Sequence, residues 1–476
     1  MRSDANHAEP ANGAPFLYSA RTRPDEPADA TLINLNLMLV NLGSSVDRQT
    51  YLPLGLLNIA ACLEREGYNV EFADYQTFSE ALAFDADLFV EQLPEPAPVI
   101  GLSCMSNLVP FCIHLAKQLK SVYPDRHIVL GGVGPSPVAG EIVEAFPFVD
   151  SVVEGEGEIS SLEILRGERS GHVPPNVPTD LDSLPLPAYS LIDFDHYDAA
   201  PSVITSRGCP YKCAFCTEPY NFGNGGVRFR DIENVLMEIE LVHERSGRRM
   251  FLFQDDILPL KPARFDHLLR RLSDLSFPIE WKCFGRVDLT TEETMRAMVD
   301  AGCKQIRYGI ESGSNKTLER IQKGFTIEHA YEVSAKSVEF FPSVHVSFIW
   351  GYPFETVEDF EETLEWITRF EQAGVTVLLF EYSPLPGSPL YREHRDKLIF
   401  SKDHYSTYVI TGHEQVRPKG YVADSAFDPV YDLIVNHPTI FSGFYHYEST
   451  EELAKRQRLE HYKKRGRTAV KNEYDL

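Results

Sequence analysis

The run Thr205-Ser206-Arg207-Gly208-Cys209-Pro210-Tyr211-Lys212-Cys213-Ala214-Phe215-Cys216 places three cysteines on one short segment. Their spacing is C-x3-C-x2-C, and three thiolates placed in this way can ligate three irons of a [4Fe-4S] cluster. No fourth cysteine lies nearby, so one iron stays open to a bound molecule. The segment therefore predicts a cluster, held by Cys209, Cys213 and Cys216, that reduces and splits what binds to it.

A structural zinc site is the main alternative for these cysteines. Structural zinc takes four ligands, which usually arrive as two spaced Cys or Cys/His pairs. No second pair lies near the run. A non-catalytic zinc or binding protein therefore stays an alternative, distinguished by the absence of iron–sulfur absorbance.

Composition limits the partners and the compartment. The 476 residues include 70 acidic and 45 basic ones, which gives a net charge of -25 at pH 7. An acidic surface repels phosphate backbones, so nucleic acid is not an expected partner. No apolar run is long enough to span a membrane, and the eight cysteines are not spaced as a disulfide framework. We expect a cytoplasmic protein of two to four domains.

Strand and helix patterns alternate in the first part of the chain. A helix is expected over residues 54–66 and another over residues 110–123. Buried strands are expected at residues 37–42, 68–74, 98–103, 127–130 and 151–155. This alternation predicts an α/β domain with a doubly wound, Rossmann-like parallel sheet. Ligands of such sheets bind at the carboxyl ends of the strands.

A second alternating region follows a proline-spaced stretch near residues 171–188. Its strands are expected at residues 202–204, 249–253, 279–283, 305–309, 344–349 and 376–380. About six strand–helix units predict an open, partial (β/α)6 barrel of the TIM type. Barrel enzymes carry their chemistry at the carboxyl ends of the strands, and Cys209 follows the first strand at that end.

Six short motifs, each at a strand end, give the chain a family resemblance. After the cysteine run come Phe253-Gln254-Asp255-Asp256, Gly285-Arg286-Val287-Asp288, Tyr308-Gly309-Ile310-Glu311-Ser312-Gly313-Ser314, Gly351-Tyr352-Pro353-Phe354-Glu355-Thr356 and Pro384-Leu385-Pro386-Gly387-Ser388-Pro389-Leu390. In this order they resemble the radical SAM superfamily, and over residues 32–390 the chain looks like members with an N-terminal cobalamin-binding-type domain. The composition of residues 1–30, rich in Ala, Pro, Asp and Glu, predicts a disordered leader. The chain pattern and the resemblance together predict a cobalamin-binding-type domain at 31–160, a linker at 161–195, the barrel at 196–390 and a C-terminal extension at 391–476.

The resemblance also implies a reaction. The open iron would be chelated by S-adenosylmethionine, and an electron from the cluster would release a 5'-deoxyadenosyl radical that abstracts hydrogen from a small biosynthetic intermediate. The cofactors supply this chemistry, while the protein supplies position and excludes water. A donor such as flavodoxin or ferredoxin would deliver the electron.

Residue roles follow from the same resemblance. Phe215 would lie under the adenine, and Arg286 is a candidate to pair with the methionyl carboxylate, with an ion pair to Asp288 or Glu311 as its alternative. The other candidate contacts of S-adenosylmethionine are Gly225, Gly226, Glu311, Ser312 and Gly351. The candidate acid–base groups are Asp255, Asp256 and Glu218. Because neighbouring side chains on a strand point to opposite faces, at most one of Asp255 and Asp256 is expected in the site.

The first domain departs from the histidine-bearing cobalamin pattern. Where Asp-x-His-x-x-Gly is expected, the chain reads Asn41-Leu42-Gly43-Ser44-Ser45-Val46. Ser103 and the pair Gly131-Gly132 remain, and glycines there let the backbone approach a corrin closely. Cobalamin binding is favoured, and a vestigial domain that only covers the barrel is the alternative.

Three activities compete on this sequence. Cobalamin-dependent C-methylation of a small molecule, as in natural product biosynthesis, leads. A cobalamin-independent radical dehydratase, epimerase or oxidoreductase, such as a diol dehydratase of aminoglycoside biosynthesis, is the alternative. Methylthiotransferases of tRNA also resemble this architecture, but the cysteines of the first domain, Cys62, Cys104 and Cys112, do not have the spacing of a second cluster.

Overall fold

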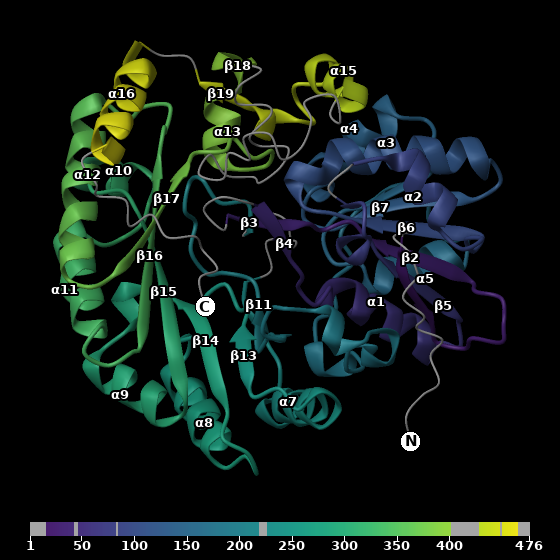
Figure 1. Cartoon of the computed structure of the whole chain (residues 1–476), viewed down its shortest axis with the longest axis horizontal. Helices are drawn as coiled ribbons and strands as arrows, with labels where there is room; N and C mark the ends of the chain where they lie inside the picture. Colours follow the sequence, from purple (N-terminus) through teal and green to yellow (C-terminus); the bar gives the residue numbers. More distant parts are fainter. Residues whose placement is uncertain are drawn as a thin grey trace.

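Two parallel sheets with their helices form the two halves of the protein (Figure 1). The structure is a computed structural model, and it describes residues 16–41, 46–81, 84–218, 226–400, 428–447 and 450–464. Within these ranges, each helix is too short or too polar to cross a bilayer.

The first half is a seven-stranded sheet in the order β1-β5-β2-β6-β7-β8-β9. Its strands are β1 (Tyr18–Arg21), β2 (Ala30–Asn34), β5 (Val70–Asp74), β6 (Val99–Ser103), β7 (His127–Gly131), β8 (Ser151–Val153) and β9 (Gly171–Val173). All neighbours are parallel except β1 with β5. The direction of winding reverses between β2 and β6, which is where doubly wound sheets bind ligands.

Helices cover both faces of this sheet. They are α1 (Leu54–Arg65), α2 (Ala86–Gln92), α3 (Val109–Val122), α4 (Ala139–Ala145) and α5 (Glu158–Leu165). The side chains of α2, α3 and α4 share one apolar core with the sheet, whereas α1 belongs to a core that continues into the second half. The two halves are therefore joined by buried apolar surface as well as by the chain.

The second half is a six-stranded, all-parallel, open sheet in sequence order. It contains β10 (Ser202–Val203), β13 (Met250–Phe253), β14 (Glu280–Gly285), β15 (Cys303–Glu311), β16 (Ser343–Trp350) and β17 (Thr376–Glu381). The helices that follow these strands are α7 (Ile232–Ser246), α8 (Pro262–Ser273), α9 (Glu292–Asp300), α10 (Asn315–Arg320), α11 (Ile327–Ser337), α12 (Val357–Gln372) and α13 (Pro389–His394). The expectation of an open, six-unit barrel is confirmed.

Local signals fix the helix ends in this half. Asp231 caps α7 by accepting from the backbone N–H of Glu233, and Gly247 ends the helix in the left-handed conformation. Thr356 and Asp359 form a capping box at the start of α12. These caps hold the loops after β10 and β16 at the carboxyl ends of the strands, where the site lies.

Several sequence expectations about the ends of the domains are wrong. Residues 18–21 form β1 and pair with β5, so the leader expected over residues 1–30 does not extend through that strand. Strand β9 pairs with β8 and carries the first sheet into the stretch expected as linker. The strand expected at residues 37–42 is not in the sheet, because Ala30–Asn34 occupies that position. Residues Met38–Asn41 instead form β3, which pairs with β4 (Val46–Gln49) in a hairpin.

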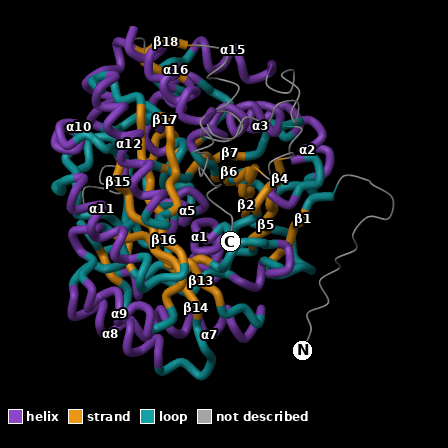
Figure 2. Tube along the Cα trace, turned by 60° about the vertical axis from the view of Figure 1, so that its left-hand side comes forward, coloured by secondary structure: helices purple, strands orange, loops and turns teal. Residues whose placement is uncertain are grey.

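The C-terminal extension contacts both halves (Figures 1 and 2). Its described elements are β18 (Leu398–Phe400), α15 (Asp428–Asn436), β19 (Tyr445–Tyr447) and α16 (Thr450–Lys464). Val430 and Ile434 of α15 join the core of the first half, whereas Leu459 and Tyr462 of α16 join the core shared with the barrel. The extension thus bridges the two halves at one end of the molecule.

Candidate functional site

The three-cysteine loop begins at a short ribbon of β11 (Ser206–Arg207) and β12 (Arg228–Phe229), at the carboxyl end of β10. Gly208 follows with φ of +94°, and a Cβ added there would lie 2.6 Å from the carbonyl oxygen of Gly226. Only glycine fits so close an approach at that φ. The backbone N–H of Ala214 then donates to the Ile321 carbonyl at 3.0 Å, which ties the loop to the barrel.

The three cysteines of this loop differ in their exposure to solvent. Cys213 is buried, and Cys209 and Cys216 are partly exposed. Burial raises the pKa of Cys209 to about 11 and that of Cys216 to about 12, and the neighbouring Cys213 raises both pKa values further. Among the described residues no three Cys, His, Asp or Glu side chains converge as one metal ion requires. Three thiols on one loop match the three ligands that a four-iron cluster with one open iron needs, whereas structural zinc takes four ligands.

Arg286 supports this loop from β14's carboxyl end. Its guanidinium lies 3.6 Å from the centre of the Tyr211 ring in the loop, a cation–π contact. Its Nε donates to Asp288 at 2.9 Å, and an Nη donates to the Lys323 carbonyl at 2.6 Å. The structure therefore contains the ion pair between Arg286 and Asp288, which the sequence analysis gave as one alternative role of Arg286.

Glu311 and Ser312 end β15 in a tightly bonded turn. Glu311 is buried at φ of +78°, an unusual conformation for a side chain larger than glycine. Burial raises its pKa, and Lys323, whose Nζ lies 3.6 Å away, opposes that shift. Ser312 accepts from the backbone N–H of Ser314 at 3.1 Å, and Ser314 is the N-cap of α10. Ser312 thus has a local role in the turn.

The aromatic candidates lie at the end of β16. The rings of Phe215 and Tyr352 are 6.3 Å apart, and Lys323 Nζ lies 5.8 Å from the Phe215 ring. Gly351 has φ of +87° and donates its N–H to Glu355 at 2.7 Å. These residues lie together at the barrel mouth. Gly226 adjoins Gly208, whereas Gly225 lies outside the described residues.

The two neighbouring aspartates have different surroundings. Asp255 is buried, and its carboxylate accepts hydrogen bonds from the Thr205 N–H, the Thr205 hydroxyl at 2.8 Å and the Ser206 hydroxyl at 2.6 Å. Asp256 instead lines a cavity together with Glu218. At most one of the two aspartates was expected in the site, and of the pair Asp256 lines this cavity whereas Asp255 does not.

That cavity lies between the two halves and measures about 380 Å³. One side comes from the first sheet and from α1, and includes Ser103, Gly131 and Gly132. The other side comes from the cysteine loop and β13, and includes Gly208 and Asp256. The predicted cobalamin residues and the predicted cluster loop therefore meet in one space.

The glycine pair shapes the floor of this cavity. A Cβ on Gly132, whose φ is +93°, would lie 2.8 Å from Ser103 Oγ and 3.0 Å from the Cys104 carbonyl oxygen. A Cβ on Gly131 would meet no atom closer than Val153 at 4.0 Å, so that position opens into the cavity. A flat surface without side chains suits the broad, planar face of a corrin, so these residues fit that cofactor. The run Asn41–Val46, where a histidine ligand was absent, lies largely outside the described residues.

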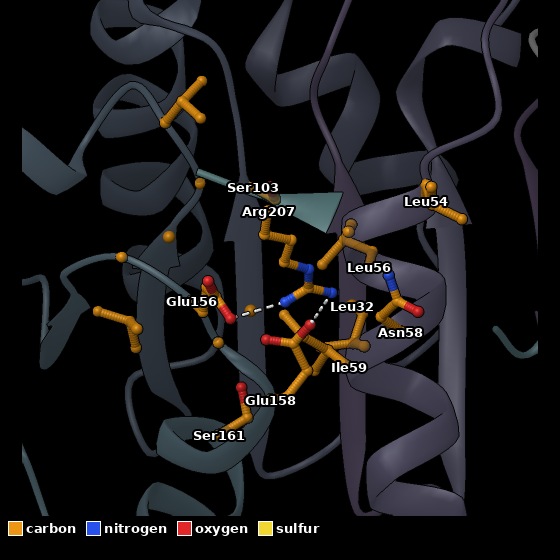
Figure 3. A pocket seen from close by; sticks show the side chains of 18 of the residues that line it. Leu32, Leu54, Leu56, Asn58, Ile59, Ser103, Glu156, Glu158, Ser161 and Arg207 are labelled. Atoms are coloured by element: carbon orange, nitrogen blue, oxygen red, sulfur yellow. Dashed lines mark hydrogen bonds and ion pairs between the residues drawn. The ribbon is translucent and has the colours of Figure 1, made fainter. Parts of the chain in front are cut away.

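An ion-pair cluster that sequence reasoning missed crosses this cavity. The guanidinium of Arg207 lies between Glu156 and Glu158 and pairs with each at 2.7 Å (Figure 3). Arg228 of β12 also pairs with Glu156. The alternating run Gly155-Glu156-Gly157-Glu158 directly after β8 was the available signal, because carboxylates at a strand end face the site of a doubly wound sheet.

The carboxylates around the cavity influence one another. Burial raises the pKa of Glu218, and the charges of Asp256 and Glu156 raise it further. Asp256 faces the cavity, but protein surrounds that space, so desolvation also raises its pKa. Two such carboxyls beside the cysteine loop are suited to holding or moving a proton.

Comparisons with known proteins agree with this arrangement. The family model for the radical SAM superfamily matches residues 203–367, and the model for the B12 binding domain matches residues 45–165. An uncharacterized methyltransferase of Pyrococcus horikoshii is 29% identical over 71% of this chain and 77% of its own length. Cytidylyl-2-hydroxyethylphosphonate methyltransferase of Streptomyces wedmorensis is 26% identical over 82% of this chain and 86% of its own.

A solved structure shares the fold. The radical S-adenosylmethionine methyltransferase TsrM of Kitasatospora setae, with cobalamin and a [4Fe-4S] cluster bound, superposes with a TM-score of 0.62. It is 18% identical and covers 78% of each chain. Both models match in the order that the motifs predict, so the chain contains a radical SAM domain that follows a B12-binding domain.

Proposed function

We propose that this protein is a cobalamin-dependent radical SAM methyltransferase that methylates carbon on a small molecule. One observation carries the proposal: the strand ends of the B12-binding domain and the cysteine loop of the radical SAM domain line the same cavity. Relatives described as methyltransferases, which match most of this chain, support the same reaction class. A dehydratase would need the loop but not the open glycine floor opposite it.

The family and the B12-binding domain imply three cofactors: a [4Fe-4S] cluster, S-adenosylmethionine and cobalamin. When bound, these groups supply radical generation and methyl transfer. Cys209, Cys213 and Cys216 would hold the cluster, and Ser103, Gly131 and Gly132 would lie against the cobalamin. Phe215, Gly351 and the turn at Glu311 and Ser312 are proposed for the S-adenosylmethionine side.

The chain's own residues position and enclose the reaction. Arg286 holds Tyr211 and so orders the cysteine loop. Arg207 with Glu156 and Glu158 joins the cluster loop to the end of β8 across the cavity, which excludes water there. Asp256 and Glu218, which line the cavity beside the cysteine loop, are proposed to orient polar groups of the substrate and to exchange protons with those groups.

The remaining assignments belong to the same proposal. A small polar intermediate of natural product biosynthesis is the expected substrate, and a flavodoxin or ferredoxin the expected electron donor. A reducing compartment such as the cytoplasm fits an enzyme whose eight cysteines are all free.

The open floor at Gly131 offers a direct test. A Gly131→Leu variant adds a side chain where a Cβ meets no close neighbour, so the fold is retained while the cavity is filled. We expect this variant to keep its cluster and lose cobalamin binding at least tenfold, measured by the visible spectrum of the anaerobically reconstituted protein. Gly140→Ala is the matched control, because Gly140 lies away from this cavity and has room for a methyl group.

Two results would contradict the proposal. The first is a wild-type protein that carries its cluster but takes up no cobalamin. The second is a deoxyadenosine-forming reaction whose product lacks water and gains no methyl group, which would favour the dehydratase alternative.

A further inference from the structure

A second cavity of about 250 Å³ adjoins the first one. It lies between the inner face of the barrel sheet and the strand ends of the first domain, and it is lined from the barrel by Lys282, Gln305 and Arg307. Lys282 stands between Leu252 of β13 and Gln305 of β15 in the strand register. Gln254 lines both cavities, so the two spaces meet at that residue.

The charges of the two cavities are opposite. The first is lined by four carboxylates, those of Glu156, Glu158, Glu218 and Asp256. The second is lined by the cations Lys282 and Arg307, and no acidic residue is among its described lining residues. Lys282 thus has no acidic counterpart among the described lining residues, in a chain of net charge -25. Cations in a low-dielectric cleft focus a positive potential that attracts anions.

The wall opposite the cations consists of fixed amides. Asn34 accepts from both nitrogens of Asn36, and Gln76 accepts from the Tyr51 N–H at 2.8 Å. Asn36 Oδ1 is buried and has no hydrogen-bond partner among the described residues, although Asn36 lines the cavity. Buried polar atoms normally have a partner, so this oxygen indicates that a donor group belongs in the space.

A buried carboxylate lies behind this wall. Asp74 is fully buried and does not line the cavity. Its oxygens accept from the Asn34 amide, the Gln76 backbone and amide, and the Tyr197 hydroxyl. Its carboxylate is therefore occupied by protein donors and does not neutralise Lys282.

From this arrangement we infer that the second cavity binds an anionic oxygen group of the substrate, a phosphonate, a phosphate or a carboxylate, through Lys282. The inference rests on the proposed function and names the class of its substrate. With the anionic end held there, the rest of the molecule extends past Gln254 into the first cavity, where the cysteine loop and Gly131 face each other. Asn36 Oδ1 accepts from a hydroxyl or amine of the same molecule.

Anion titrations of the reconstituted holoenzyme test this inference. Calorimetric titrations with methylphosphonate and with acetate compare the wild type with Lys282→Met, which keeps the length of the side chain, and with Lys282→Arg, which keeps its charge. We expect Lys282→Met to lose roughly tenfold in affinity, as one charged contact contributes, and Lys282→Arg to recover most of it. Lys304→Met is the control, because Lys304 lies on the same sheet but pairs with Glu280 and lines neither cavity.

The two titrations distinguish between the possible anionic groups of the substrate. A selective loss of methylphosphonate binding supports a phosphonate or phosphate substrate, and a selective loss of acetate binding supports a carboxylate. Wild-type protein without saturable anion binding, or Lys282→Met that binds both anions as tightly as the wild type, overturns the inference. A Lys282→Gln variant repeats the comparison if the methionine variant is unstable.

The pH dependence of sulfate binding gives a second readout. Burial, followed by the charge of Arg307, lowers the pKa of Lys282 to about 8. Sulfate keeps its charge above neutral pH, so its affinity should fall as pH rises through about 8 in the wild type and stay flat in Lys282→Met. Arg307 on β15 is the one charged described residue that faces Lys282 from the neighbouring strands.

The two proposals fail in different ways. Absence of cobalamin or of the cluster from the visible spectrum would contradict the proposed function. Unchanged anion binding in Lys282→Met with both spectra intact would contradict only the substrate class.

Discussion

At the scale of single residues, neighbouring groups of the same type have opposite roles. Asp255 accepts three protein hydrogen bonds and holds β11 against β13, whereas Asp256 exposes its carboxylate to the cavity. The sequence predicted that at most one of them faces the site, because side chains alternate along a strand. Which one enters depends on where Thr205 and Ser206 lie, and that is set by tertiary contacts.

This difference predicts opposite behaviour for two amide variants. Asp255→Asn should lower the free energy of unfolding by about 2 kcal/mol, because an amide nitrogen would face the Thr205 and Ser206 donors. Asp256→Asn should leave stability nearly unchanged while it lowers turnover. Urea unfolding of the apoprotein and product formation by the reconstituted enzyme check the pair; equal losses of stability would contradict the assigned roles.

At the scale of elements, the C-terminal helix α16 is held by a buried ion pair. Lys455 Nζ lies 3.2 Å from Glu355 Oε2, and both side chains are almost fully buried. Glu355 also accepts from the N–H of Gly351. The end of the chain thus fixes the loop after β16 that shapes the barrel mouth.

The burial of Glu355 predicts a pH dependence. Burial raises its pKa to about 7 from an ordinary value near 4.5, despite Lys455. Between these values the folded protein binds a proton that the unfolded chain has lost, so this group makes folding more favourable as pH falls from about 7 to 4.5. Relative to Glu355→Gln, the free energy of unfolding of the wild type should rise by roughly 1 kcal/mol for each unit by which the pH falls within that window. Parallel pH profiles of urea unfolding for the two proteins would refute this.

At the scale of the whole molecule, the two halves are clasped across the site. The apolar core runs from α1 into the barrel, and Arg207 and Arg228 reach from the ribbon beside the cysteine loop to Glu156 and Glu158. A movement of either half therefore changes both the cluster loop and the glycine floor.

Breaking the ion pairs of Arg207 should weaken the binding of both the cluster and cobalamin. Arg207→Met leaves Glu156 with one partner and Glu158 with none, and an unpaired buried charge costs about 3 kcal/mol. We expect a lower free energy of unfolding and weaker cobalamin binding, with Arg207→Lys intermediate. Surface variant Arg166→Met, which breaks an exposed pair with Glu66, is the control and should change little. A stable Arg207→Met protein with full cobalamin affinity would contradict this role.

The sequence by itself determined the class of fold and predicted the cluster ligands. Apolar runs with helical spacers specify parallel sheets, and C-x3-C-x2-C specifies a three-thiolate site, because both depend on local spacing along the chain. The sequence expectation was wrong at one strand, because residues 37–42 were expected in the sheet and residues 30–34 occupy that position. Packing between β5 and β6 decides which of the two runs enters the sheet, and this packing cannot be read from the sequence.

Only the tertiary structure decided how the site is charged. Arg207 between Glu156 and Glu158, Arg286 on Tyr211, and Lys282 beside Arg307 each join residues from separate segments. Electrostatic effects depend on distance and burial in space, so their partners follow from how the two sheets pack and not from any motif. The same packing brings Gly131 and Gly208, distant along the chain, to the walls of one cavity.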